Sequence, residues 1–399
     1  MAIFVIIGRY SNVKIIIMSR FTEPPLSLYI HLPWCARKCP YCDFNSHEAK
    51  DVIPEEAYIT ALIEELDQSA ITLANRPLIS IFFGGGTPSL FSPQAIEAIL
   101  QAVQKRFRFN QNIEITLEAN PGTVDESRFK GFFAAGINRL SLGIQSLQNE
   151  KLKILGRIHD SDQALGAIRT AKAAGFTNFN LDLMYGLPDQ SIPDALADIE
   201  MALAEHPTHF SWYQLTIEPN TFFYHQPPVL PLDDVIWEMQ LAGQEKIAQR
   251  GFKQYEVSAY SLPNKHCLHN RNYWEFGDYL GIGAGAHSKI SHVNEGTIQR
   301  FSQVKNPRDY LNTETRSKQN VTLLKETDLI FEFMLNALRL TDGIPYQYFY
   351  ERTGLSNKEI EPFIHEALKR GFLVDDREHL CPSEQGKKYL NNLVGMFLT

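Results

Sequence analysis

Three of the five cysteines of this chain stand close together, as Cys35, Cys39 and Cys42 in the pattern C-x3-C-x2-C. Thiolates are soft ligands that suit zinc or iron–sulfur clusters. A structural zinc site usually takes four ligands as two separated pairs, and no second pair of cysteines follows, although His31 or His47 could complete a tetrahedron. Three thiolates on a [4Fe–4S] cluster leave one iron open for a small chelating molecule, which explains why the count stops at three.

Further polar and glycine-rich motifs come at the ends of apolar, strand-like runs. The cysteines follow the first run, and Gly84–Ser89 follows the second. The next three runs end in Glu118–Gly122, Gly143–Ser146 and Leu181–Gln190. We therefore expect strands to position these motifs. The six runs are Ser27–Leu32, Leu78–Phe83, Ile113–Glu118, Ile137–Ile144, Thr177–Met184 and His209–Ile217.

Stretches with helical spacing separate these runs. Strands that alternate with helices indicate a parallel sheet with right-handed crossovers. Six such units predict an α/β fold, a partial (β/α)6 barrel similar to a TIM barrel, although the spacing also suits an open doubly wound sheet. In parallel barrels the site forms at the carboxyl ends of the strands, so the five motifs should meet at one mouth. The helical stretches are Pro54–Leu73, Pro93–Phe107, Glu126–Ala135, Asp160–Ala174 and Ser191–Ala204.

After about Tyr260 the alternation stops. His266–Ser288 is rich in aromatic residues, histidine and glycine, and the polar stretch Asn312–Asn320 predicts a linker. From Asp328 onward the order helix, helix, short hairpin, helix is typical of a winged-helix-like module, and its acidic residues argue against DNA binding. We expect an N-terminal extension (1–25), a core barrel (26–262), a connecting region (263–320) and a small, mostly helical C-terminal domain (321–399).

The composition limits the class of protein. The chain has 399 residues, of which 44% are hydrophobic and 21% charged, and a net charge of −8. This is the composition of an ordinary globular protein, and its negative charge argues against general nucleic-acid binding. An odd count of five cysteines, three of them clustered, favours a metal site in a reducing cytoplasm over a secreted disulfide framework.

The N-terminal residues 1–17 contain two short apolar runs, which Arg9, Asn12 and Lys14 interrupt. Neither run reaches the roughly 20 residues that cross a bilayer, and no secretory cleavage site stands out. Met18 is a candidate start, because the globular pattern begins only near Leu26. We expect a cytoplasmic protein, and its N-terminal extension is a candidate for a peripheral contact with a membrane.

The C-x3-C-x2-C pattern directly after a first strand resembles the radical S-adenosylmethionine (SAM) enzymes. In that superfamily the open iron binds the amino and carboxylate groups of SAM. The stretch Gly84–Pro88 is similar to the superfamily's glycine-rich motif, where missing side chains let the backbone approach the ligand closely. The resemblance implies a [4Fe–4S] cluster and SAM as cofactors, with Cys35, Cys39 and Cys42 as the cluster ligands.

Longer stretches narrow the resemblance to the HemN-like family, the coproporphyrinogen dehydrogenase group, from Leu26 to the C-terminus. They are YIHLPWCARKCPYCDF, FFGGGTPS, LEANPG, RLSLGIQS, LGRIH and LDLMYGLPDQ. The family implies that Tyr29 packs on SAM near the cluster and that Tyr41 contacts the adenine. Further contacts with SAM are implied for Gly85, Gly86, Thr87, Glu118, Gln145, Arg157, Asp182 and Thr216.

Structural roles are the alternative for three of these residues. Arg157 and Asp182 could form an ion pair that only supports the barrel, since paired charges are common in such folds. Glu118, at the end of a strand-like run, could cap the turn that follows.

Two features point to one branch of this family. The oxidases carry a fourth cysteine two residues after the third, where this chain has Phe44. The stretch His269–Trp274 has the pattern H-N-x-x-Y-W, which resembles the HemW branch of haem chaperones and implies haem binding. A neutral imidazole can ligate haem iron, and Tyr273 and Trp274 offer flat apolar surface to a porphyrin. His269 is the candidate haem ligand.

Other histidines compete for that role, namely His266 and His287. Two functions also compete. In the first, the protein is a haem chaperone that carries haem as cargo, and its cluster and SAM regulate homodimerisation or transfer to acceptors such as respiratory membrane enzymes. In the second, it is a radical SAM oxidative decarboxylase of coproporphyrinogen III. Phe44 and the H-N-x-x-Y-W stretch favour the chaperone. A zinc-stabilised barrel without redox chemistry is a third interpretation.

Overall fold

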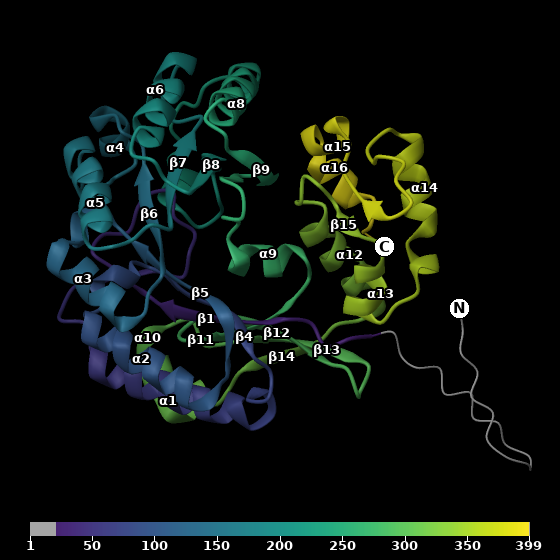
Figure 1. Ribbon diagram of the computed structural model, residues 1–399, viewed down its shortest axis with the longest axis horizontal. Coiled ribbons are helices and arrows are strands. Elements are labelled where there is room, and N and C mark those ends of the chain that lie inside the picture. Colours follow the sequence, from purple (N-terminus) through teal and green to yellow (C-terminus); the bar gives the residue numbers. More distant parts are fainter. Residues whose placement is uncertain (1–20, 399) are drawn as a thin grey trace, which may run out of the picture.

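The six strands predicted from the sequence lie side by side in chain order, and each neighbouring pair is parallel. The structure is a computed structural model that describes residues 21–398 (Figure 1). The partial (β/α)6 barrel is confirmed, and the order of these strands lacks the reversal of a doubly wound sheet. The strands are β1 (Leu26–Leu32), β4 (Leu78–Gly85), β5 (Phe109–Ala119), β6 (Arg139–Gln145), β7 (Phe179–Tyr185) and β8 (His209–Gln214).

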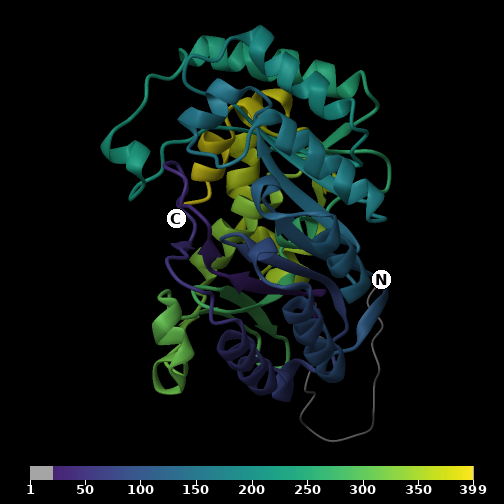
Figure 2. The same cartoon turned by 90° about the vertical axis from the view of Figure 1, so that its left-hand side faces the viewer.

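Helices between these strands cover the outer face of the sheet (Figures 1 and 2). Their ends agree with the predicted ends because local side chains cap them. The Ser92 hydroxyl accepts a hydrogen bond from the Ala95 N–H, and Asp160 and Gln163 form a reciprocal capping box. These helices are α1 (Glu55–Leu73), α2 (Pro93–Arg106), α3 (Glu126–Ala135), α5 (Ser161–Ala173) and α6 (Ile192–Leu203). Three further helices lie outside the predicted stretches: α4 (Asn149–Ile154) follows β6, and α7 (Phe222–His225) and α8 (Asp233–Ala248) follow β8. In α7 the Phe223 N–H donates a hydrogen bond to the Pro40 carbonyl at 3.0 Å.

The sheet continues beyond the predicted strands at both edges. Strand β11 (Asp278–Ile282) pairs in parallel with β1, and β12 (His287–His292), β13 (Thr297–Ser302) and β14 (Asn320–Leu323) follow it in antiparallel order. At the other edge β10 (Ala259–Ser261) and β9 (Lys253–Glu256) extend the sheet from β8. Within the described residues this makes one sheet of 12 strands. The added strands are short or partly polar, so their own sequences carry no clear strand pattern.

The region between the barrel and the C-terminal domain is therefore more ordered than a linker. Helix α9 (Leu268–Trp274) carries the H-N-x-x-Y-W stretch and leads into β11. A short helix, α11 (Thr313–Arg316), lies within the predicted linker Asn312–Asn320, and another, α10 (Pro307–Leu311), directly precedes it. The predicted boundaries of the connecting region, at 262 and 320, remain a proposal. This region supplies strands β11 to β13 and the start of β14 to the barrel sheet.

The C-terminal part is a small, mostly helical module with its own apolar core, as predicted (Figure 1). Phe333, Met334 and Leu393 are buried in that core. A two-stranded ribbon of β15 (Ile344–Pro345) and β16 (His379–Leu380) lies within it. The helices are α12 (Glu326–Ala337), α13 (Gln347–Thr353), α14 (Glu361–Lys369), α15 (Glu384–Lys388) and α16 (Leu390–Gly395).

The described part of the chain begins inside the predicted extension. Phe21 is buried in the core of the C-terminal module, and the Pro25 carbonyl accepts a hydrogen bond from Asp278 N at 3.0 Å. Residues 21–25 therefore belong to the folded structure. Among residues 21–398 no helix is both long and apolar enough to cross a membrane. The predictions for residues 1–17, the membrane contact included, lie outside the described residues.

Candidate metal centre and the cavities beside it

The three clustered cysteines line one cavity of about 330 Å³, which we name the cluster cavity. They lie on the loop after β1, whose two ends are held together by the short strands β2 (Trp34–Cys35) and β3 (His47–Glu48). Cys35 is buried, and Cys39 and Cys42 are half-buried. The glycine turn after β4 lines the same space, so the fold brings the three thiols and this turn together.

The three thiols can ionise together only if a cationic group lies beside them. Burial, together with the neighbouring Cys42 and Cys39, raises the pKa of Cys35 to about 11, because thiolates repel one another. The Arg157 Nη1 group donates a hydrogen bond to Cys39 Sγ at 3.5 Å and supplies one positive charge. Iron bound by the three sulfurs would stabilise all three thiolates, so the donor set fits a [4Fe–4S] cluster.

The zinc alternative finds no support in the geometry. Both ring nitrogens of His31 already have partners, because Nδ1 lies 3.0 Å from the Tyr29 hydroxyl and Nε2 lies 2.8 Å from the Asn45 carbonyl oxygen. Within residues 21–398, no group of three or more His, Cys, Asp or Glu side chains is arranged to hold a single metal ion. The three cysteines of this loop are therefore not gathered around one ion.

The glycine turn packs directly against the cysteine loop. The Gly86 N–H donates to the Leu32 carbonyl at 2.9 Å, and the Thr87 N–H donates to the Trp34 carbonyl at 2.7 Å. Gly85 has a φ of 119°, which favours glycine, and a Cβ atom there would lie 2.7 Å from His31 Cε1. A Cβ atom on Gly86 would overlap the Trp34 carbonyl group. Only glycine lets the two loops close over this cavity.

Glu118 lies at the carboxyl end of β5 and points into the cluster cavity. It accepts a hydrogen bond from the Gly85 N–H at 3.3 Å. Burial and the neighbouring Asp182 raise the pKa of Glu118 to about 8, so the carboxyl is largely protonated at neutral pH. The turn after β5 is capped instead by Asn120, whose Oδ1 accepts from the Gly122 N–H. The capping alternative for Glu118 is thus not what the structure shows.

The alternative of an Arg157–Asp182 ion pair is also absent among the described residues. Asp182 accepts hydrogen bonds from Ser141 Oγ at 3.0 Å and Asn180 Nδ2 at 2.8 Å. Arg157 donates to the Gly143 carbonyl at 2.7 Å as well as to Cys39. Both side chains line the cluster cavity, and each is oriented by its own partners.

Most of the residues predicted to contact SAM line the cluster cavity together. Tyr29 instead faces two neighbouring cavities, and Thr216 is exposed beyond the end of β8 and outside the lining of the cluster cavity. Those that share the cluster cavity are Tyr41, Gly85, Gly86, Thr87, Glu118, Gln145, Arg157 and Asp182.

Tyr213 was not predicted from the sequence, yet it lines the cluster cavity from β8. Its hydroxyl donates to Gln145 Oε1 at 2.6 Å, and Gln145 has a φ of 70° that turns the end of β6 toward the cavity. A tyrosine in an apolar strand carries no chemical signal of its own. The one available signal was its place within the sixth predicted strand, because the observed strand ends earlier, at Gln214.

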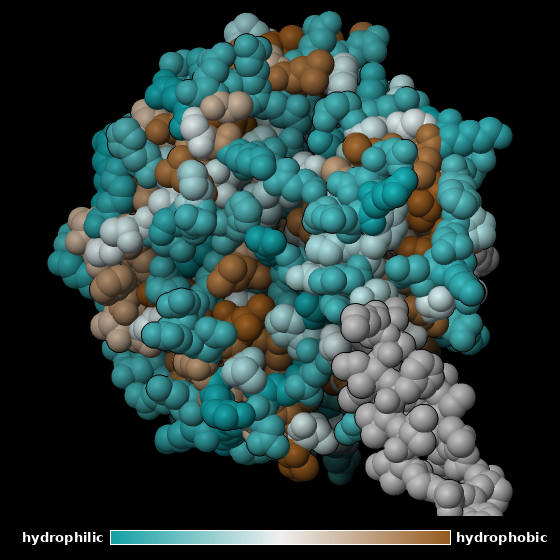
Figure 3. Space-filling view, turned by 45° about the vertical axis from the view of Figure 1, so that its right-hand side comes forward, coloured by the Kyte–Doolittle hydropathy of each residue, from teal (hydrophilic) through white to brown (hydrophobic). Residues whose placement is uncertain are grey.

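A second cavity, the outer cavity, has a volume of about 730 Å³ and adjoins the cluster cavity. Lys38, Cys42, Phe44, Gly85 and Glu118 line both. The remaining wall of the outer cavity comes largely from the end of α9 and the region after it. Tyr273, Trp274, Tyr279, His287 and Lys305 are part of that wall. Near the middle of the face in Figure 3, apolar side chains are gathered within a mostly hydrophilic surface.

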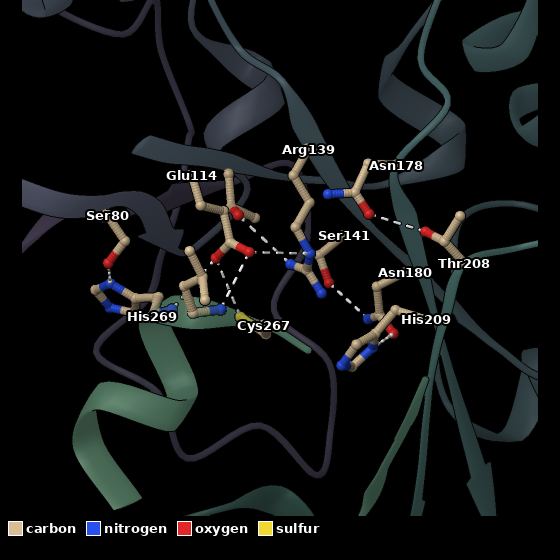
Figure 4. A network of polar contacts seen from close by, with 12 residues as sticks. Ser80, Glu114, Arg139, Ser141, Asn178, Asn180, Thr208, His209, Cys267 and His269 are labelled. Atoms are coloured by element: carbon tan, nitrogen blue, oxygen red, sulfur yellow. Dashed lines mark hydrogen bonds and ion pairs between the residues drawn. The ribbon is translucent and has the colours of Figure 1, made fainter. Parts of the chain in front are cut away.

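The predicted haem ligand His269 lies away from the outer cavity, in a network of polar contacts inside the barrel (Figure 4). It is 1% exposed, and its ring contacts Ser80 Oγ through Nδ1 at 3.0 Å and the Tyr273 hydroxyl through Nε2 at 2.9 Å. Burial, with Arg139 nearby, lowers the pKa of His269 to about 3, so the ring is neutral. Both nitrogens are engaged in hydrogen bonds within the barrel.

Glu114 anchors the start of α9 in the same network (Figure 4). Its carboxylate accepts hydrogen bonds from the backbone N–H groups of Leu268 and His269, at 3.1 and 3.2 Å, and from Cys267 Sγ at 3.5 Å. A carboxylate at the N-terminus of a helix is favourable because the first N–H groups there have no partner within the helix. This anchor presents Tyr273 and Trp274, at the other end of α9, to the outer cavity.

Comparison with known proteins agrees with this arrangement. The family model described as "Radical SAM superfamily" matches residues 29–202, and the one described as "HemN C-terminal domain" matches residues 324–387. The chain also resembles a solved structure, the radical SAM enzyme coproporphyrinogen III oxidase (HemN) of Escherichia coli. The TM-score is 0.79 with 22% identity, over 96% of this chain and 92% of that one, which shows a shared fold.

Curated relatives are more similar in sequence. The chain is 48% identical to the heme chaperone HemW of Haemophilus influenzae, over 94% of this chain and 98% of the relative. It is 46% identical to the heme chaperone HemW of Escherichia coli, with the same coverage. Identity at this level along nearly the whole of both chains places the protein in one family with them: it belongs to the HemW family of the radical SAM superfamily.

Proposed function

We propose that this protein is a cytoplasmic haem chaperone, which binds a [4Fe–4S] cluster with SAM, carries haem and transfers it to acceptor proteins. The observation that supports this most directly is the continuity of two cavities. One contains the three thiols, and the other is larger and lined by aromatic side chains. Relatives at 46–48% identity are named heme chaperones.

In this proposal Cys35, Cys39 and Cys42 hold three irons of the cluster, and the fourth iron is open to the amino and carboxylate groups of SAM. The chain's own residues bind and orient that molecule. The glycine turn at Gly85 and Gly86 lets the backbone approach it, because no side chain intervenes.

The acidic and cationic side chains of the cluster cavity have distinct tasks. Glu118, protonated at neutral pH, is able to donate a hydrogen bond to a carboxylate or to ionise beside an ammonium group. Asp182 is held by Ser141 and Asn180, so it presents a fixed carboxylate. Arg157 donates a hydrogen bond to Cys39 Sγ and so stabilises the Cys39 thiolate.

Haem is proposed to contact Tyr273 and Trp274 in the outer cavity. The volume of about 730 Å³ lies within the range of roughly 300–1,000 Å³ that is usual for sites of cofactor-sized molecules. Aromatic rings give a porphyrin a flat apolar surface. The acceptors we propose are haem proteins, respiratory membrane enzymes among them, and a homodimer and a peripheral membrane contact belong to the same proposal.

A direct test measures two activities of the anaerobically reconstituted protein side by side. The first is haem uptake, followed by absorption spectroscopy. The second is conversion of coproporphyrinogen III to protoporphyrinogen in the presence of SAM and a reductant. We expect uptake of about one haem per chain and no decarboxylation. Efficient turnover to protoporphyrinogen, or failure to retain haem, would contradict the chaperone function.

A further inference from the structure

We propose that the outer cavity is the haem pocket and that His287 supplies the axial ligand to the haem iron, with Lys305 and Lys38 facing the propionates. This inference rests on the proposed haem-binding function and adds the ligand and the orientation of the cargo. It assigns the iron to a histidine outside the H-N-x-x-Y-W stretch.

The position of His287 suits a ligand. It begins β12, its side chain is exposed, and it lines the outer cavity. Among the hydrogen bonds of residues 21–398, none involves its ring. Partial burial, Arg300 and Lys305 lower the pKa of His287, so the ring is neutral at pH 7 and keeps a lone pair for a metal. His31, Arg300 and Lys305 are the titratable and charged groups that act on it.

Each of the other nearby histidines has a different role. His31 is the second histidine in the wall of the outer cavity, and both its nitrogens are occupied by Tyr29 and Asn45. His269 is buried, and its nitrogens are occupied by Ser80 and Tyr273. His266 lies outside the wall of the outer cavity and stacks on Tyr255 with 4.3 Å between ring centroids. His287 can therefore bind iron without the loss of a hydrogen bond within the described residues.

The charge of the cavity suits a molecule with two carboxylates. Four cationic side chains line it, but two of them are neutralised. Lys289 Nζ lies 2.9 Å from Asp278 Oδ1, and Arg300 Nε lies 3.0 and 2.8 Å from the Glu332 oxygens.

Lys305 and Lys38 are exposed at the rim, and neither forms an ion pair among residues 21–398. The Lys38 ammonium donates to the carbonyl oxygens of Phe44 and Ser46, each at 3.3 Å, which leaves one of its three donors. Of the two acids in the wall, Glu118 is largely protonated, so the cavity is net positive at neutral pH. Charge-assisted contacts between these lysines and the propionates would place the porphyrin plane among Tyr273, Trp274 and Tyr279.

The test is a titration of full-length, cluster-containing protein with ferric haem. The variants are His287→Ala and His287→Gly, with His266→Ala as the matched control. We expect the His287 variants to lose the Soret and visible bands of a histidine-ligated haem and to bind haem about tenfold or more weakly. Imidazole added to His287→Gly should restore the ligated spectrum. His266→Ala should behave as the wild type does.

Iron and sulfide content are measured in every sample, because a normal cluster shows that the barrel has folded. A His287 variant that keeps its cluster and binds haem with an unchanged spectrum and affinity would overturn the inference, while haem carriage itself would stand. A wild-type protein that binds no haem would overturn the proposed function as well.

The propionate contacts have a separate readout. Lys305→Glu should weaken the binding of haem several-fold but leave the binding of haem dimethyl ester unchanged, since the ester has no carboxylate to pair with a lysine. Lys318→Glu, an exposed lysine outside the outer cavity, is the control for the change in net charge. Equal losses for haem and its ester would contradict the proposed orientation.

Discussion

The backbone N–H of Gly85 donates a hydrogen bond to the carboxyl group of Glu118 across 3.3 Å. This bond joins the glycine turn after β4 to the end of β5 at the mouth of the barrel. Glu118 also lines the cluster cavity, the outer cavity and the small inner cavity that contains His269. One carboxyl group therefore contacts all three cavities, including the two in which we place the chemistry of this protein.

The protonation of Glu118 should make stability depend on pH. A carboxyl whose pKa is about 8 in the folded protein and about 4.3 in the unfolded chain favours folding at low pH, and this contribution is lost as the pH rises toward 8. Glu118→Gln cannot ionise. We expect the free energy of unfolding of the variant, relative to the wild type, to rise between pH 4 and 8 by on the order of a few kcal/mol and then to level off.

Urea unfolding of SAM-free protein across this pH range checks that prediction. Glu326→Gln, an exposed residue at the start of α12, is the control for loss of one acidic group. A difference that stays constant with pH, or one that falls as the pH rises, would contradict the burial of a protonated carboxyl.

Cys39 should be essential for the cluster. Its sulfur is the one that accepts a hydrogen bond from Arg157, and two thiols alone leave a second iron without a protein ligand. Cys39→Ala should abolish the brown chromophore of the anaerobically reconstituted protein and its bound iron. Cys381→Ala, which removes a thiol of the C-terminal module, should retain both. Wild-type iron content in Cys39→Ala would remove Cys39 from the ligand set.

The glycine turn should not tolerate even one methyl group. In Gly86→Ala the new Cβ would overlap the Trp34 carbonyl, so the turn and the cysteine loop must separate. We expect a loss of about 1–3 kcal/mol in the free energy of unfolding and less cluster per chain.

Gly166→Ala is the matched control, because its Cβ would meet no atom within 4 Å and the position lies inside helix α5. This change should stabilise the protein by about 0.5–1 kcal/mol. Chemical unfolding and iron analysis measure both variants. Normal stability and a full cluster in Gly86→Ala would mean that the two loops are not closely packed.

Much of this protein was determined by local sequence. The spacing of Cys35, Cys39 and Cys42, the glycine turn and the alternation of strands and helices predicted the barrel and its mouth. Such features depend on side-chain periodicity and on capping residues such as Ser92 and Asp160, which act within a few residues of chain. Because parallel strands must place their carboxyl ends at one edge, the sequence also brought the cysteines and Glu118 together.

Only the tertiary structure decided which side chains are available. His269 and His287 are equal as imidazoles in the sequence, but the fold buries the first against Ser80 and Tyr273 and leaves the second open to a cavity. Strands β11 to β14 likewise exist through pairing with distant residues, not through their own pattern. The fold also decides that Tyr213 lines the cluster cavity and that Thr216 does not. Burial and hydrogen-bond partners are set by residues far apart in the chain, so no local pattern can specify them.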